Sequence, residues 1–195
     1  MARNRQTIKK KCRNLGLEPS ILGVNKKSNR NIRPNANRKL TEYGTQLREK
    51  QKARFVYGVQ EKQFYKLYEE ATRKDGVTGE LLLQYLERRL DNVIYRLGFG
   101  TTRRQARQIV SHGHILINGK RVNIASYRVK QGDVLSIKEN SKELSIIKES
   151  VGQKTVPGWL SLEEGTLTAK VLENPGRDAI DFEINEAMII EFYSR

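Results

Sequence analysis

The positive charge of this 195-residue chain is concentrated in its first 40 residues, and that segment contains little from which a core could form. It holds 12 Lys and Arg residues against one acid, Glu18, and no aromatic residue precedes Tyr43. Such a segment cannot bury enough apolar surface to offset the entropy lost on ordering. We therefore expect residues 1–42 to form a basic arm that becomes ordered only on a polyanion.

A solvated tail without a partner and attachment to a membrane surface are the alternatives for this arm. The arm has no amphipathic apolar face and no lipidation signal, which favours nucleic acid as the polyanion. Residues 41–140 continue the basic excess with 19 basic and 11 acidic side chains, whereas residues 141–195 are acidic. The formal charge of the whole chain is +15.

Composition also excludes several classes of protein. A hydrophobic content of 37% is too high for wholesale disorder, and no apolar run approaches the roughly 18–20 residues of a membrane span. Ile8 is the only large aliphatic residue between Ala2 and Cys12, so we expect no secretory leader. A single cysteine forms no intrachain disulfide, which places the chain in a reducing compartment, the cytoplasm.

Apolar spacing predicts three helices after the arm. The first begins near Tyr43 and ends at Gly58, and the second ends at Asp75-Gly76. The third runs without interruption from Leu82 to Leu97 and is closed by Gly98. The buried stripe of the second helix comprises Phe64, Leu67, Tyr68 and Ala71.

The middle of the chain predicts one more helix followed by strands. A capping box at residues 102–105 opens the helix, whose buried stripe is Ala106, Ile109 and Val110. Residues 114–117 and 120–123 are predicted strands around an Asn118-Gly119 type I′ turn, and residues 127–130 and 134–137 form a second predicted pair. Residues 145–148 fit a strand, and Trp159 is interpreted as a packing anchor in preference to a base-stacking platform.

Asn185 is predicted to cap a last helix that is too short to stand alone and packs back on the early helices. The fold class is therefore α+β. We expect a basic N-terminal arm (1–42) and a helical domain (43–87) that is completed by the C-terminal helix (178–195). We also expect an inserted domain (88–177) whose helices pack on a small, mainly antiparallel sheet.

A constellation of basic side chains falls on this inserted segment. Arg88, Arg89 and Arg96 lie on one helix, and Arg103, Arg104 and Arg107 on the next, where the first and last share a face. The hairpin adds Lys120 and Arg121, with Arg128 and Lys130 beyond. The planar guanidinium group binds phosphate bidentately, so this pattern predicts contacts to RNA phosphates; a solvated charged face is the alternative. We expect Arg103, Arg104 and Arg107 to be exposed.

Metal binding and catalysis find little support in the sequence. His112 and His114 stand two apart on a predicted strand, but no nearby Cys, Asp or Glu completes a metal site. The sequence contains no Ser/His/Asp or Cys/His arrangement for nucleophilic catalysis. We expect no enzyme activity, no cofactor and no metal.

Several collinear motifs resemble one family, the bacterial small ribosomal subunit protein four. They include Arg89-Leu90-Asp91, Arg103 to Gln108, His112 to Ile115, Asn118 to Val122, Tyr127 to Val129 and Gly132-Asp133. Outside that module, Tyr43-Gly44, Leu47 to Lys52, Tyr57 to Val59, Gln63-Phe64, Phe182 to Glu186 and Glu191 to Arg195 also match. Some members carry four zinc-binding cysteines near the start; this chain has only Cys12 and resembles the zinc-free variety.

The resemblance implies a structural component of the small ribosomal subunit, not a homo-oligomer there. It implies primary binding to a helix junction in the 5′ domain of small-subunit rRNA early in assembly, and an influence on translational accuracy. Its implied neighbours are ribosomal protein five and mRNA at the channel through which it enters. An RNA-modifying enzyme, such as a pseudouridine synthase, and a free regulatory RNA-binder or chaperone are the two alternatives.

The expected RNA contacts come from the arm, the first helix and the inserted module. They are Arg3, Arg5, Lys9, Lys10, Lys11, Arg13, Lys26, Lys27, Arg30, Arg33, Arg38, Tyr43, Arg48, Lys50, Lys52, Arg54, Arg88, Arg89, Thr102, Arg103, Arg104, Arg107, His112, Lys120 and Arg121.

Overall fold

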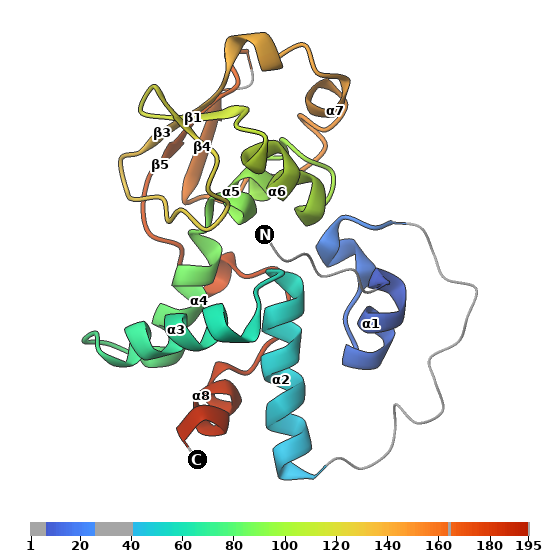
Figure 1. The fold of residues 1–195 in the computed structure, drawn as a ribbon, viewed down its shortest axis with the longest axis vertical. Helices are drawn as coiled ribbons and strands as arrows, with labels where there is room; N and C mark the ends of the chain where they lie inside the picture. The colour runs from blue at the N-terminus through green and yellow to red at the C-terminus, as the bar shows by residue number, and fades with distance from the viewer. Residues whose placement is uncertain (1–6, 26–40, 164, 195) are drawn as a thin grey trace. The chain divides into compact units, whose positions relative to one another are not determined.

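A computed structural model describes residues 7–25, 41–163 and 165–194 of the chain (Figure 1). The chain divides into two compact units. The first, called here the helical unit, comprises the described residues up to Leu82 together with those from Asp181 onward; the second, the sheet unit, is Leu83–Ile180. No helix among the described residues is both long and apolar enough to cross a bilayer.

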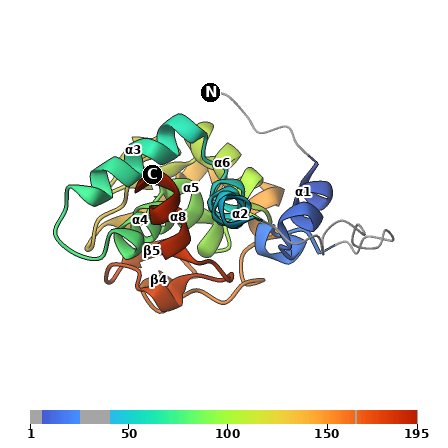
Figure 2. The ribbon, with the colours of Figure 1, turned by 90° about the horizontal axis from the view of Figure 1, so that it is seen from below.

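The helical unit is built around α2 (Glu42–Val56), α3 (Glu61–Thr72), the start of α4 (Thr78–Glu87) and the last helix, α8 (Glu186–Ser194). Helix α8 lies along α2 in both views (Figures 1 and 2), which confirms that the C-terminal helix completes the helical core. Phe64, Ala71 and Ile189 are fully buried there. The Asn185 side chain accepts a hydrogen bond from the Met188 amide at 3.3 Å, so the predicted cap of α8 is confirmed.

The prediction that the arm has no core of its own is wrong for residues 7–25. They form α1 (Ile8–Leu15) and the 3₁₀ turn η1 (Pro19–Leu22), and α1 packs on α2. Cys12 and Leu15 are buried on one side of the amphipathic α1, and Leu17 and Leu22 of the following turn are buried as well. The contact with α2 thus helps to order this segment, and the composition of the segment alone does not reveal that contact.

The predicted single helix from Leu82 to Leu97 is in fact two, α4 and α5 (Leu90–Arg96). Arg89 adopts an extended conformation between them and forms a β-bridge with Arg128. The Val129 amide donates to the Arg88 carbonyl at 3.0 Å and the Leu90 amide donates to the Tyr127 carbonyl at 2.8 Å. Pairing with a distant segment therefore replaces the helical hydrogen bonds at this point, although the apolar spacing continues through it.

The sheet unit contains one antiparallel sheet with strand order β2-β1-β3-β5-β4. The strands are β1 (Ile115–Ile117), β2 (Lys120–Val122), β3 (Val134–Ile137), β4 (Leu160–Glu163) and β5 (Thr168–Val171). Helices α5 and α6 (Arg103–Ser111) pack on each other, and their buried residues join those of the strands in one core. Three short elements complete the unit: η3 (Glu139–Ser141), α7 (Ser145–Lys148) and η4 (Arg177–Ala179).

The β1–β2 hairpin forms as predicted. Asn118 and Gly119 have φ values of 50° and 78°, the left-handed pair that a type I′ turn requires. Trp159 is 3% exposed within the core, which confirms its interpretation as a packing anchor. The α+β fold class, with helices packed on a small antiparallel sheet, is confirmed.

Two predicted strands of this unit are wrong. Residues 127–130 form no strand beyond the single bridge at Arg128, because β3 pairs with β1 and β5 instead. Residues 145–148 form α7, in which the Ile147 amide bonds to the Leu144 carbonyl at 2.9 Å. Ile147 is buried whereas Ile146 is 44% exposed, so the local Ser-Ile-Ile-Lys pattern satisfies a helical turn as well as a strand.

Candidate nucleic-acid interface

Helix α6 begins at a capping box whose second half is shifted by one residue. Thr102 Oγ1 accepts from the Gln105 amide at 3.1 Å, as the sequence predicts. The Gln105 side chain reaches back past the cap, where its Oε1 accepts from the Thr101 amide at 2.7 Å. The buried stripe of Ala106, Ile109 and Val110 is confirmed, so one side of α6 is fixed in the core.

The glycine-rich approach to α6 serves packing within the fold. A Cβ atom on Gly100 would lie 2.9 Å from the Ala106 backbone nitrogen. Only glycine allows the chain to pass so close to the helix, since a backbone neighbour cannot move aside as a flexible side chain can. This contact sets the position of the first turn of α6.

Arg103 was expected on the exposed face of α6, but it is 8% exposed. Its guanidinium group donates to Asn92 Oδ1 and lies 4.5 Å from the centroid of the Tyr95 ring. Lys154 approaches the same ring at 3.3 Å and donates to the Gly100 carbonyl at 2.9 Å. Two cations therefore contact one buried aromatic ring. Lys154 lies 51 positions after Arg103, too far along the chain for a local sequence pattern to pair them.

Asp91 is the carboxylate that organises the arginines of this region. It is 4% exposed and accepts from Arg89 through Nε and Nη2, at 3.2 and 3.1 Å. Arg107 Nε donates to the same carboxylate at 2.7 Å. Arg89 is consequently buried, whereas Arg107 keeps a partly exposed side chain.

Glu87 forms a second buried acidic centre at the end of α4. It is fully buried and accepts from Arg96 at 3.1 and 2.8 Å and from the Asn92 side chain at 2.7 Å. Asn92 thereby connects Glu87 to Arg103. Neither Glu87 nor Asp91 was predicted to have a role. Both are isolated acids within the arginine-rich stretch 87–107, and that position could have marked them as partners of the arginines.

Four of the predicted RNA contacts in the sheet unit remain exposed, namely Arg104, His112, Lys120 and Arg121. Arg121 Nη2 donates to the His112 carbonyl at 3.1 Å, and its guanidinium group lies against Gly113, where a Cβ would collide with it. The structure therefore brings Arg121 to the C-terminal end of α6, while Arg104 and the cap residue Thr102 lie at its N-terminal end.

Arg88 is half-buried behind this surface. Its Nε donates to the Val129 carbonyl at 2.8 Å. Burial lowers the pKa of Arg88, and the nearby Arg128 guanidinium lowers it further. The Val129 carbonyl thus holds the charged group, and Asp133 nearby acts in the opposite direction, to raise its pKa.

Three predicted RNA contacts of α2 take part in ion pairs within the helical unit. Lys50 is buried, with Nζ 3.0 Å from Glu61 and 4.0 Å from the centroid of the Phe192 ring. Arg54 pairs with Glu61 at 2.8 Å, and Lys52 with Glu49 at 2.6 Å. These basic side chains stabilise the packing of α2 within its own unit.

The other predicted contacts of this unit are more accessible. Tyr43 is exposed, Arg48 is partly exposed, and α1 carries Lys9, Lys10, Lys11 and Arg13 at exposed or partly exposed positions. Seven further predicted contacts lie outside the described residues: Arg3, Arg5, Lys26, Lys27, Arg30, Arg33 and Arg38.

Glu61 makes the stability of the helical unit depend on pH. Burial alone would raise the pKa of Glu61, but the Tyr193 phenol, the Lys50 ammonium and the Arg54 guanidinium together lower it. A lowered folded-state pKa stabilises the fold above the unfolded value of about 4.3, and this stabilisation is lost as pH falls through the folded value. In Glu61→Gln this contribution is absent, so we expect the free energy of unfolding to fall less steeply below about pH 4.3 than in the unsubstituted chain. Denaturant unfolding followed by far-UV circular dichroism measures it. Equal pH profiles for Glu61→Gln and the unsubstituted chain would contradict this.

Comparisons with known proteins identify the family. Residues 3–87 match the model described as "Ribosomal protein S4/S9 N-terminal domain", and residues 88–135 match the model described as "S4 domain". The chain is 66% identical over 195 residues to the small ribosomal subunit protein uS4 of Fusobacterium nucleatum, covering the whole of both chains. The chain belongs to the uS4 family.

Two further uS4 relatives agree with this assignment. The protein of Lachnoclostridium phytofermentans is 54% identical over 199 residues and covers both chains completely. The uS4A protein of Symbiobacterium thermophilum is 57% identical over 160 residues, 81% of this chain and 77% of its own. The two family models meet at residues 87 and 88, where α4 ends and the extended segment before α5 begins.

Membership in the uS4 family confirms the resemblance stated above. The chain is a structural component of the small ribosomal subunit that binds rRNA, and it is not an enzyme. The alternative of an RNA-modifying enzyme is therefore wrong. The ribosome is the location of the chain.

The histidines and the cysteine lie in separate surroundings in this uS4 family member. The rings of His112 and His114 are 5.9 Å apart, and His114 Nδ1 lies 2.9 Å from Ser141 Oγ. Burial lowers the pKa of His114, with further contributions from His112, Arg121 and Lys138. Cys12 is buried, and burial raises the pKa of its thiol. Within the described ranges, no group of three or more His, Cys, Asp and Glu side chains is placed to hold a metal ion.

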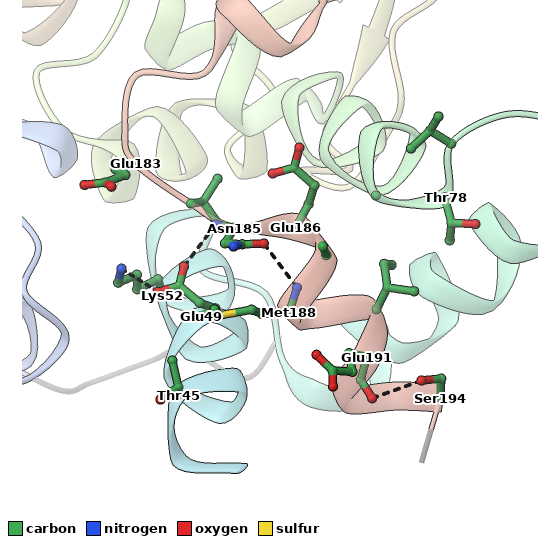
Figure 3. A pocket seen from close by; sticks show the side chains of 15 residues that line it. Thr45, Glu49, Lys52, Thr78, Glu183, Asn185, Glu186, Met188, Glu191 and Ser194 are labelled. Atoms are coloured by element: carbon green, nitrogen blue, oxygen red, sulfur yellow. Dashed lines mark hydrogen bonds and ion pairs between the residues drawn. The ribbon is translucent and has the colours of Figure 1, made fainter. Parts of the chain in front are cut away.

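An open groove of about 1060 Å³ lies in the helical unit, between α2, the start of α4 and α8 (Figure 3). Four acids line it, Glu49, Glu183, Glu186 and Glu191, together with apolar Val77, Met188 and Ile190. Its one lining lysine, Lys52, is paired with Glu49. An acidic surface repels phosphates, so this groove of the uS4 fold suits a protein better than RNA.

Proposed function

We propose that this chain binds the helix junction of the small-subunit rRNA 5′ domain as a primary binder, nucleates assembly of that domain, and influences translational accuracy. The observation that carries the proposal is the anchoring of α6. Its apolar side is fixed in the core and Arg107 is held by buried Asp91, while Arg104 is exposed. Guanidinium groups on a rigid support match phosphates at fixed positions with little loss of entropy on binding.

The functional parts that we propose are a basic arm (1–42), a helical domain (43–87 with 178–195) and an RNA-binding module (88–177). The buried positions among the predicted contacts act by supporting the fold, and so do the partly exposed Lys52 and Arg54, whose charges are paired with Glu49 and Glu61. The residues that we propose as direct rRNA contacts are the accessible ones: Lys9, Lys10, Lys11, Arg13, Tyr43, Arg48, Arg88, Thr102, Arg104, Arg107, His112, Lys120 and Arg121, together with the seven arm residues beyond the described ranges.

A double substitution of two exposed basic residues of the module, one on α6 and one on β2, tests this function. We expect Arg104→Gln with Lys120→Gln to weaken binding to a naked 5′-domain transcript about 10-fold or more, because each neutralised phosphate contact is lost. The slope of log K against log salt should fall by roughly 0.7–0.9 per lost contact. Filter binding across a salt series measures both quantities.

The matched control is Lys170→Gln, an exposed lysine on β5 of the same unit that is not a proposed contact. It should leave both the affinity and the salt slope close to those of the unsubstituted chain. If the unsubstituted chain, the double variant and Lys170→Gln all show the same slope of log K against log salt, the module does not bind phosphates through Arg104 and Lys120. Release of the chain from small subunits in a moderate salt wash would contradict the proposal that it is a primary binder of their rRNA.

The acidic groove leads to a proposal about neighbouring proteins. We infer that it receives a basic segment of ribosomal protein five, and that contact with mRNA occurs near this partner at the channel through which mRNA enters. Support comes from the acids that line the groove and from the apolar residues beside them, which a protein segment can cover.

A charge reversal tests the groove. Glu186→Lys places a cation on the wall between α8 and the start of α4, and we expect it to abolish co-purification with ribosomal protein five from reconstituted subunits, since like charges then meet. Binding to naked rRNA should stay unchanged. The exposed Glu173→Lys, in the sheet unit, serves as the control. A variant that still retains protein five would show that this groove is not its docking site.

A further inference from the structure

Tyr65 presents an aromatic ring to solvent while two other rings hold it in place. It is 44% exposed, although the preceding Phe64 is completely buried and fills the core beneath α3. The Tyr65 ring lies 6.1 Å from Tyr68 and 5.4 Å from Tyr193, measured between centroids, and those two rings are 4.7 Å apart. The ring is therefore preorganised without being needed for burial.

The support beneath Tyr65 is itself anchored. The Tyr193 phenol donates to Glu61 Oε1 at 2.6 Å, and Glu61 also pairs with Lys50 and Arg54. Burial raises the pKa of Tyr193, so its phenol remains protonated and continues to donate. Helices α2, α3 and α8 each contribute to this support, which fixes the plane of the exposed ring.

The charges beside the ring indicate what kind of partner it meets. Lys62 and Lys66 are exposed and precede and follow Tyr65 on α3. The acid nearest to them in sequence, Glu61, is already neutralised by two cations, and Glu69 and Glu70 are only partly exposed on the next turn. On α3, Lys62 stands one turn before Tyr65 and Lys66 follows it in sequence, so two exposed cations lie on the same helix as the ring. This arrangement matches a base with its flanking phosphates better than an apolar protein surface.

We propose that Tyr65 is a stacking platform for an unpaired base of rRNA, with Lys62 and Lys66 on the adjacent phosphates. This rests on the proposed rRNA-binding function and adds to it a site in the helical unit, separate from the basic residues of α6 and the hairpin. Stacking recognises the face of a base and so requires a single-stranded nucleotide, not a duplex.

Three substitutions of Tyr65 in the full chain test the site against a naked 5′-domain transcript. Tyr65→Ala should weaken binding by about 5- to 100-fold, the range that loss of one stacked base gives, with an unchanged salt slope because no phosphate contact is lost. Tyr65→Phe keeps the ring and should bind within about 2-fold of the unsubstituted chain. Tyr65→Leu keeps apolar bulk but no aromatic face and should resemble Tyr65→Ala. Lys62→Gln with Lys66→Gln should lower the salt slope instead.

The outcomes separate this proposal from the function on which it rests. If Arg104→Gln with Lys120→Gln weakens binding but Tyr65→Ala binds normally, the platform is wrong and the function stands. Retention of affinity by Tyr65→Leu would show a general apolar contact and would also overturn it. If Tyr65→Ala binds naked rRNA normally yet is lost from reconstituted subunits, a protein covers this face. Affinities are expressed per folded molecule, from circular dichroism of each variant.

Discussion

Glu87→Ala is expected to destabilise the sheet unit by about 3–5 kcal/mol, the usual cost of removing one partner of a buried ion pair. The substitution leaves the Arg96 guanidinium buried without the carboxylate that accepts two of its hydrogen bonds. It also removes one of the two acceptors of the Asn92 side-chain amide, which keeps only the Glu87 backbone carbonyl, and Asn92 in turn accepts from Arg103. The whole polar network behind α6 therefore loses its centre.

Trp159 offers a direct measurement, because it is the chain's single tryptophan and is buried in the sheet-unit core. Urea unfolding followed by its fluorescence should show a large drop in the midpoint for Glu87→Ala. Glu173→Ala, an exposed acid of the same unit, should change the unfolding free energy by no more than about 0.5 kcal/mol. Similar midpoints for the two variants would mean that the buried pair contributes little.

Arg103 and Arg104 are adjacent on α6, but their substitution by alanine is expected to affect different properties. Arg103→Ala should reduce stability, and Arg104→Ala should reduce rRNA binding. Arg103→Ala should cost about 2–4 kcal/mol, since a buried acceptor on Asn92 loses its donor and Tyr95 loses a cation. Arg104→Ala should stay within about 0.5 kcal/mol in stability, because its side chain is exposed, yet weaken rRNA binding roughly 10-fold. Alanine keeps the helix propensity high in both.

Unfolding followed by Trp159 fluorescence and filter binding to the 5′-domain transcript, on the same preparations, separate the two effects. Binding by Arg103→Ala is expressed per folded molecule and should be close to that of the unsubstituted chain. A stable Arg103→Ala variant that fails to bind RNA would return Arg103 to the set of direct contacts. The expectation that Arg103, Arg104 and Arg107 are all exposed is wrong for Arg103, and Arg107 is held by the buried Asp91.

Local chemistry made part of the fold predictable. The Thr102 cap, the Asn118-Gly119 turn and the Asn185 cap depend on residues within a few positions of one another, and all three are confirmed. The break at Arg89 was missed because its cause, the backbone of residues 127–129, lies nearly 40 positions away. For the same reason, apolar spacing could not show that α1 packs on α2.

Charge patterning located the basic positions but not their environments. Arg103 and Arg104 are adjacent and chemically identical, yet one is buried against Tyr95 and the other is exposed. In the sequence, Lys50 is one of several cations on α2. It is buried because Glu61 of α3 and Phe192 of α8 contact it, and neither contact follows from the local sequence. A sequence gives the number of positive charges, whereas tertiary contacts decide which of them a phosphate can reach.

The position of α8 bears on how the chain is made. Helix α2 leaves the translating ribosome well before α8, so the surface of α2 that α8 covers stays open while the residues between them are made. The sheet unit, encoded between them, contains all of its own strands and can reach its native state while the chain is still attached. A chain that stops before Tyr193 thus lacks the bond of that phenol to Glu61, and a chain that stops before Glu186 leaves this surface of α2 uncovered.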